Sequence, residues 1–229
     1  MAHDDSPGRP IILVDVLGTL VDQFGSLRAR VGEATGWRDA QASRAVRTWL
    51  DLVSGMERDV SAGAAPFVPS HALDAAALAR MASDGTLPAE AVPALTDAAH
   101  RLEPWPDTVE GLRRIAEDAT VVGLSNASHR VLTGLRSSSG MHWDQAISAE
   151  DAGAYKPDPR IYRTALANVP PGSGAPYMVA AHAWDLRAAA RAGMRTAYVP
   201  RPGGDPPTNG DSFDIRAADL LDLRAQLRS

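Results

Sequence analysis

Short runs of consecutive apolar residues recur along this chain, and each ends abruptly at polar residues. The first run is Ile11-Ile12-Leu13-Val14, which stops at Asp15. Similar runs cover residues 119–124, 145–148, 177–181 and 195–199. Runs without alternation of apolar and polar positions are typical of parallel strands that helices bury on both faces. The pattern therefore predicts a central parallel sheet.

Helical patterns separate these runs from about residue 106 onward. Val109, Leu112 and Ile115 keep the spacing of one helical face. Asp158-Pro159 has the form of an N-cap followed by proline at the first helical position, and Gly193 closes a helix over residues 185–192. Alternating strands and helices predict a doubly wound, Rossmann-like α/β sheet. Its functional groups are expected at the carboxyl ends of the strands.

The stretch 22–104 differs, because apolar residues there keep helical spacing and no strand pattern interrupts them. The three sets that show this spacing are Ala42, Val46, Trp49, Leu50, Val53 and Val60; Leu73, Ala76, Ala77 and Met81; and Ala91, Val92, Leu95, Ala99 and Leu102. Such an insertion directly after the first strand predicts a helical cap over the strand ends. We expect residues 1–21 and 105–229 to form the α/β core domain, and residues 22–104 to form the cap domain.

Composition narrows the class of protein. Of 229 residues, 45% are hydrophobic, which suffices for a core without disulfides, and the chain has no cysteine. The net charge of -5, with no Lys/Arg cluster, argues against nucleic acid as a partner. No apolar run approaches the roughly 20 residues of a membrane span, and the polar, acidic start at residues 1–5 is unlike a secretory signal. We expect a soluble, cytoplasmic protein without a membrane partner.

Three charged residues fall where chemistry is expected. Asp15 follows the first buried strand, and flexible Gly18 is close by, so its carboxylate can be presented to an electrophilic carbon and shielded from water. Lys156 lies at a strand end just before a helix, where its ammonium can hold Asp15 ionised and offset the charge of an anionic substrate. Asp185 opens a helix and is suited to an N-cap.

Four separated segments together resemble the haloacid dehalogenase superfamily. They are Asp15-Val16-Leu17-Gly18-Thr19-Leu20, Leu124-Ser125-Asn126, Tyr155-Lys156-Pro157-Asp158-Pro159 and Ala181-His182-Ala183-Trp184-Asp185. Within the superfamily the chain looks most like the type II 2-haloacid dehalogenases. That resemblance implies hydrolysis of short 2-halocarboxylates to 2-hydroxycarboxylates through an aspartyl ester, with neither a metal nor another cofactor. It also raises a homodimer as one expectation, since family members are often dimeric.

The resemblance implies a role for each catalytic candidate. Asp15 would be the covalent nucleophile, and Thr19 would hydrogen-bond to it. Lys156 would balance charge, and Asp185 would orient the water that hydrolyses the ester. In the same family pattern Ser125 helps to hold the substrate carboxylate.

Other positions would bind the halide and line the pocket. Asn126 would help to take up the departing halide, together with Arg47 on the first cap helix and Phe67 in the following loop. Arg44 is a rival for Arg47, because the alignment of the cap slips by a residue or two. The resemblance further implies that Tyr162 lies near the nucleophile.

Some positions depart from the family pattern. Leu17 stands where the family has Tyr or Phe, Ala180 replaces a serine, and His182 often corresponds to asparagine. Losing the serine removes one hydrogen bond near the nucleophile, whereas a neutral His182 retains a donor. Trp184 is expected to be a wall of the pocket. We include Leu17 and His182 among the substrate-binding candidates.

Two other classes of function stay open at this point. Most superfamily members are magnesium-dependent phosphatases, but these carry a second aspartate where this chain has Leu17 and a metal-binding carboxylate where it has Ala181. Leu17 has no proton to give a leaving group, and Asp15 with Asp185 alone makes a poor magnesium site. The other alternative is a binding or regulatory protein with a decayed active site.

Overall fold

The computed structural model describes residues 9–228, so the acidic start of the chain lies outside the described residues. Its main sheet has six parallel strands in the order β5-β4-β1-β6-β7-β8. The strands are β1 (Ile11–Val14), β4 (Thr120–Ser125), β5 (Gln145–Ser148), β6 (Tyr177–Ala180), β7 (Arg195–Tyr198) and β8 (Ile215–Arg216). The predicted parallel α/β sheet is confirmed, with β8 as a short edge strand that the apolar runs did not indicate.

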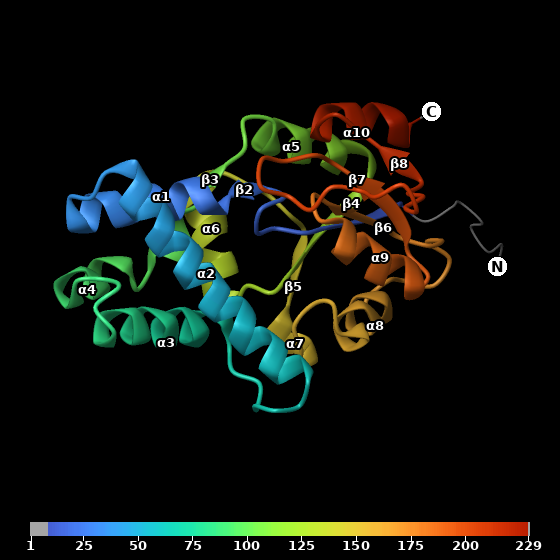
Figure 1. The fold of residues 1–229 in the computed structure, drawn as a ribbon. Helices are drawn as coiled ribbons and strands as arrows, with labels where there is room; N and C mark the ends of the chain where they lie inside the picture. The colour runs from blue at the N-terminus through green and yellow to red at the C-terminus, as the bar shows by residue number, and fades with distance from the viewer. Residues whose placement is uncertain (1–8, 229) are drawn as a thin grey trace.

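Helices cover both faces of this sheet (Figure 1). One face packs against α5 (Thr108–Asp118), α6 (His129–Ser139) and α10 (Leu220–Leu227), and the other packs against α7 (Ala149–Ala152), α8 (Pro159–Ala167) and α9 (Ala183–Arg191). Strand β1 shows why its four residues are all apolar. Ile12 and Val14 pack in the same cluster as the helices of the first face, and Ile11 and Leu13 pack in the same cluster as those of the second. Every side chain of the strand is therefore buried.

Residues between β1 and the rest of the sheet are helical. They form α1 (Gln23–Thr35), α2 (Asp39–Ser61), α3 (Ser70–Ser83), the 3-10 turn η1 (Ala89–Ala91), α4 (Val92–Leu95) and the 3-10 turn η2 (Ala98–Arg101). Figure 1 shows α1 to α4 grouped to one side of the sheet. A short antiparallel ribbon of β2 (Val21–Asp22) and β3 (Glu103–Pro104) joins the two ends of this segment.

The helical spacing of apolar residues from Ala91 to Leu102 predicts one continuous helix, and that prediction is wrong. The chain there makes a single α-helical turn and then a separate 3-10 turn. Pro93 lies in the first turn of α4, where its missing N–H is tolerated, and the hydroxyl of Thr96 donates a hydrogen bond to the Val92 carbonyl oxygen. The apolar spacing identified the buried face correctly but not the break in the helix.

The helical segment shares its hydrophobic core with the sheet. Trp49 of α2 and Met81 of α3 belong to the same cluster of buried residues as Ile12 and Val14 of β1. Each of these four side chains is almost completely buried. A division into a core and a cap domain at residues 21/22 and 104/105 stays a prediction.

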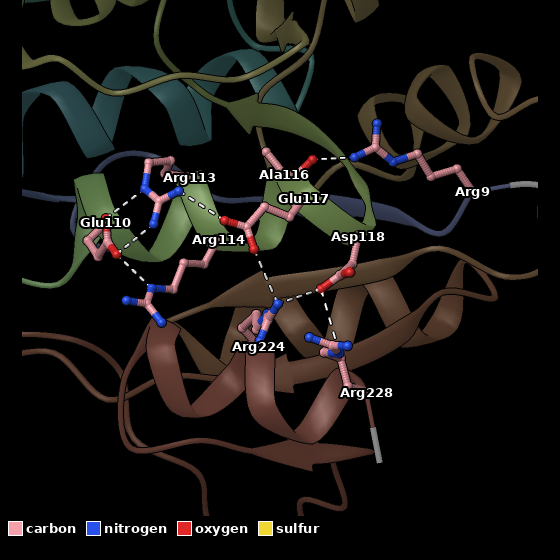
Figure 2. A network of polar contacts seen from close by, with 9 residues as sticks. All are labelled: Arg9, Glu110, Arg113, Arg114, Ala116, Glu117, Asp118, Arg224 and Arg228. Carbon is pink, nitrogen blue, oxygen red and sulfur yellow. Dashed lines mark hydrogen bonds and ion pairs between the residues drawn. The ribbon is translucent and has the colours of Figure 1, made fainter.

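Ion pairs near the surface also link α5 to α10 on the first face of the sheet (Figure 2). Glu117 and Asp118 of α5 pair with Arg224 of α10 at 3.3 and 3.0 Å. Arg113 pairs with Glu110 and Glu117 along α5 itself. In the part of the chain that the structure describes, no helix combines the length and the apolar character that crossing a membrane requires.

Candidate active site

The carboxyl ends of three neighbouring strands bring the predicted residues together. Asp15 directly follows β1, Ser125 ends β4, and the segment after β6 leads to Asp185 at the start of α9. Strand β1 lies between β4 and β6 in the sheet, so the loops that leave these three strands meet at one edge. The backbone N–H of Asp15 still donates to the Val179 carbonyl oxygen at 2.9 Å, which fixes the first residue beyond the strand.

Lys156 lies between two buried carboxylates. Its Nζ donates to Asp15 Oδ1 at 2.8 Å and to Asp185 Oδ2 at 2.6 Å. The lysine side chain is 1% exposed, and those of Asp15 and Asp185 are 7% and 0% exposed. A buried charge is costly unless it is paired and hydrogen-bonded, so the three charges stabilise one another only as a set.

This arrangement shifts proton affinities in a definite way. Burial alone would lower the pKa of Lys156, but the charges of Asp15 and Asp185 and the hydrogen bonds to them leave it raised. Burial raises the pKa of Asp185, the charge of Asp15 adds to this, and Lys156 opposes it. The lysine is therefore held as a cation beside the two carboxyl groups.

Thr19 fixes the second oxygen of Asp15. Its Oγ1 donates to Asp15 Oδ2 at 2.6 Å and accepts the backbone N–H of Ala181 at 2.9 Å. Because the N–H of Ala181 takes a lone pair of the hydroxyl, the hydroxyl hydrogen is directed toward the carboxylate. Both oxygens of Asp15 are thus hydrogen-bonded, and the carboxylate cannot rotate freely.

Tyr162 of α8 completes the buried cluster. Its hydroxyl donates to Asp185 Oδ1, opposite the oxygen that Lys156 contacts. Burial and the neighbouring charge of Asp185 raise the pKa of Tyr162, so the phenol stays a donor. The predicted position near the nucleophile therefore corresponds to direct contact with Asp185.

Ser125 and Asn126 lie beside this cluster. Ser125 is fully buried, and its Oγ accepts the backbone N–H of Ala127 at 3.1 Å. Asn126 is half-buried, and its Oδ1 accepts the backbone N–H of Lys156 at 2.7 Å. That bond fixes the orientation of the amide group, with Nδ2 pointing away from Lys156.

Three of the predicted pocket residues, His182, Trp184 and Leu17, are half-buried. The rings of His182 and Trp184 stack with centroids 5.7 Å apart. Gly18, at a φ of +81°, comes so close to the His182 ring that a Cβ there would lie 2.8 Å from Nε2. Only glycine fits this turn, because any side chain would be both strained and in contact with the imidazole.

Phe67 is linked to the site through an aromatic residue that the sequence analysis named only as part of a motif. Its ring lies 5.1 Å from that of Tyr155, which is fully buried just before Lys156. The Tyr155 hydroxyl donates to the Val68 carbonyl oxygen at 2.6 Å. The loop after α2 is thereby attached to the strand-end residues.

The structure does not bring the two candidate arginines into contact with the cluster. Arg47 is exposed, with its guanidinium carbon 5.9 Å from the centroid of the Phe24 ring, and Arg44 is also exposed. Among the described residues, no hydrogen bond or ion pair joins either arginine to Asp15, Asn126 or Lys156. The helical face that approaches Asn126 carries a different residue.

That residue is Glu57 of α2, which the sequence analysis missed. Asn126 Nδ2 donates to Glu57 Oε2 at 3.2 Å. Burial raises the pKa of Glu57 from 4.5 to about 7, with Asn126 and Lys156 opposing the rise and Asp74 adding to it. Asp74 of α3 behaves similarly: burial raises its pKa to about 6, and it accepts the indole N–H of Trp49 at 2.8 Å.

The helical periodicity of α2 held the only early signal for Glu57. Val46, Leu50, Val53 and Glu57 follow one another at intervals of three or four residues, so an acid stands on the face that turns inward. Within residues 9–228, no group of three or more His, Asp or Glu is placed to hold a metal ion.

Comparison with known proteins gives this cluster a context. The family model of haloacid dehalogenase-like hydrolases matches residues 10–193, which is most of the chain. The chain belongs to this family. All of the buried cluster, from Asp15 to Asp185, lies within the matched residues of the hydrolase family.

Individual relatives of this chain agree with that assignment. An (S)-2-haloacid dehalogenase from Pseudomonas fluorescens is 35% identical over 113 residues, covering 48% of this chain and 50% of the relative. The chain thus spans about half the length of the curated relatives it matches. A solved L-2-haloacid dehalogenase is 31% identical over 96% of this chain and 99% of its own, with a TM-score of 0.86. A defluorinating L-2-haloacid dehalogenase is 30% identical over 96% of both chains, with a TM-score of 0.85.

Proposed function

We propose that this protein is a hydrolytic dehalogenase that converts short 2-haloalkanoic acids to 2-hydroxy acids through an ester on Asp15. The observation that carries the proposal is the Lys156 ammonium held between Asp15 and Asp185 in a buried site. A lysine in this place balances the charge of the carboxylate nucleophile, and the named activity of the relatives supports the choice of substrate.

The first step forms the ester. An oxygen of Asp15 attacks C2 of the acid as the C2–halogen bond breaks, and the halide leaves with the bonding electrons. Positioning does most of the work, because both carboxylate oxygens are already fixed by Lys156 and Thr19. The substrate carboxylate is proposed to lie beside Ser125, near the start of α6, where the positive end of a helix favours an anion.

The second step releases the product. Water attacks the ester carbonyl carbon of Asp15, and the bond between that carbon and the product oxygen breaks. One proton of the water ends on the product hydroxyl, and the other is released. Asp185, held by Lys156 and Tyr162, is the group proposed to orient this water.

One residue, Leu17, favours this reaction over phosphoester hydrolysis. Leu17 offers no proton to a leaving alkoxide, whereas a halide needs none. The half-buried Leu17 therefore removes a group that the phosphatase reaction uses and that dehalogenation does not.

An activity screen tests the proposal. Chloro-, bromo- and fluoro-2-alkanoic acids and a general phosphoester are incubated with the protein, with and without a chelator, and halide or phosphate release is measured. We expect halide release that the chelator leaves unchanged. Phosphate release that chelation abolishes and magnesium restores would instead identify a phosphatase. Tight binding of a small anion without any turnover would identify a binding protein.

A further inference from the structure

The helical segment meets the strand-end residues through few polar side chains. Ser70 and His71 of α3 both contact Ser128, at 2.8 Å to its N–H and 3.0 Å to its hydroxyl. Glu57 of α2 contacts Asn126. Of these contacts, only the one with Asn126 is connected to the nucleophile. Asn126 accepts the backbone N–H of Lys156, and Lys156 Nζ donates to Asp15.

In-line attack fixes where the leaving group must go. Asp15 lies at the carboxyl end of the central strand β1, so we place the substrate carbon between it and the helical segment, and the halide then departs away from the sheet. Glu57 is on the helix that faces this direction, and its carboxyl group already shares a hydrogen bond with the Asn126 amide. A leaving halide needs hydrogen-bond donors there, and an ionised carboxylate would repel it.

We propose that Glu57, in its neutral carboxylic-acid form, donates a hydrogen bond to the departing halide and is thus a further catalytic residue. This inference rests on the proposed dehalogenation. No proton is transferred: the carboxyl O–H stabilises the halide, and the other oxygen continues to accept the Asn126 amide hydrogen. The structure thereby supplies a donor on the helical side without Arg47, which lies exposed over Phe24.

The surroundings of Glu57 allow this neutral form near pH 7. Its pKa of about 7 results from burial, with the charge of Asp74 from α3 acting in the same direction. Asn126 and Lys156 from the strand-end loops and Arg58 on α2 act in the opposite direction. Tyr155 is a further titratable neighbour, and burial and the charges of Glu57 and Asp74 keep it a neutral phenol by raising its pKa.

Three variants of the full chain test the inference through rate, pH dependence and leaving group. Glu57→Ala removes the donor, Glu57→Gln keeps an N–H donor that does not titrate, and Asp74→Asn is the matched control. Asp74 is a neighbouring acid that is also half-buried and raised in pKa, but Trp49 holds it and it makes no contact with Asn126. Circular dichroism and thermal unfolding establish that each variant is folded.

Halide release is measured from pH 5 to 9 with 2-fluoro, 2-chloro and 2-bromo acids. For the wild type we expect kcat to fall as pH rises through about 7. Glu57→Ala should lower kcat about a hundredfold at pH 6, most for fluoride because it is the poorest leaving group. Glu57→Gln should stay within about tenfold of the wild type and lose the fall in kcat above pH 7. Asp74→Asn should keep the fall but show it at lower pH, because the charge of Asp74 no longer raises the pKa of Glu57.

Three results would overturn the inference alone, and the first two are Glu57→Ala with wild-type rates and a Glu57→Gln profile that still falls above pH 7. A uniform loss with all three halogens would also contradict it, because a merely structural role does not depend on the leaving group. If the wild type releases no halide from any acid, the proposed function fails, and the inference fails with it.

Discussion

At the strand ends Lys156 lies between Asp15 and Asp185, with Nζ–O distances of 2.8 and 2.6 Å. On the facing helices Glu57 and Asp74 are acids too, but neutral donors hold them, an amide at 3.2 Å and an indole at 2.8 Å. Burial raises the pKa of Glu57 to about 7 and that of Asp74 to about 6. At the strand ends the Lys156 cation opposes the rise in pKa that burial causes and favours the ionised form that a nucleophile needs. Glu57 and Asp74, held by neutral donors, are pushed toward the neutral form, which can donate a hydrogen bond.

Among the strand-end residues, the largest loss of activity is expected for Asp15→Asn. The amide keeps the shape of the side chain but has no nucleophilic oxygen, so halide release should fall at least about ten-thousandfold. Halide release under saturating substrate measures this effect. Most of the activity surviving in the folded variant would contradict the covalent scheme.

Lys156→Met removes the cation and leaves Asp15 facing Asp185 in a buried site. We expect turnover to disappear and the free energy of unfolding at pH 7 to fall by about 3–5 kcal/mol. Part of that loss should return at pH 5, since protonating one carboxyl group relieves the repulsion between them. Urea unfolding at both pH values measures this change, and a loss below about 1 kcal/mol at pH 7 would contradict the account.

Glu57→Gln tests the acid on the helical side through the pH dependence of the free energy of unfolding. The pKa of Glu57 is raised from 4.5 to about 7 on folding, so the wild type loses stability as pH rises through that window. Relative to wild type, the variant should therefore gain about 3 kcal/mol in the free energy of unfolding between pH 4.5 and pH 8.5. Denaturant unfolding across this range is the measurement, and a constant difference would show that Glu57 does not change its proton affinity.

The smallest effect is expected on the surface ion pairs of α5 and α10 (Figure 2). Arg113 contacts Glu110 and Glu117, and its side chain is 59% exposed. Arg113→Ala should change the free energy of unfolding by less than about 1 kcal/mol and leave activity unchanged. Thermal unfolding with a parallel rate measurement checks both, and a larger loss would mean that these exposed pairs act as a coupled network.

The positions of the strand-end residues could be predicted from the sequence, because they depend on short local patterns of apolar and polar residues. Apolar runs ending at Asp15 and Ser125 predicted where parallel strands stop, and strands that stop at one sheet edge bring such residues together. The contact of Tyr162 with Asp185 needed the packing of α8 beside α9 and was predicted only as nearness to the nucleophile.

The helical side was harder to predict, because the direction of each side chain depends on how α2 packs. Arg47 and Glu57 are ten positions apart on one helix, and only packing decides that Arg47 lies exposed over Phe24 while Glu57 meets Asn126. The break in the helix predicted over residues 91–102 has a similar origin. Apolar spacing indicates which residues are buried but not whether the hydrogen-bonded turns are continuous.

A single-turnover reaction in heavy-oxygen water tests the central claim most directly. With protein in excess over a 2-haloalkanoic acid, mass spectrometry compares the peptide that contains Asp15 with the hydroxy acid released. If water attacks the carbonyl carbon of an Asp15 ester, the peptide gains heavy oxygen and the first product carries none. Heavy oxygen in the first product with an unlabelled Asp15 would mean that water attacks the substrate directly, and the proposed nucleophile would be wrong.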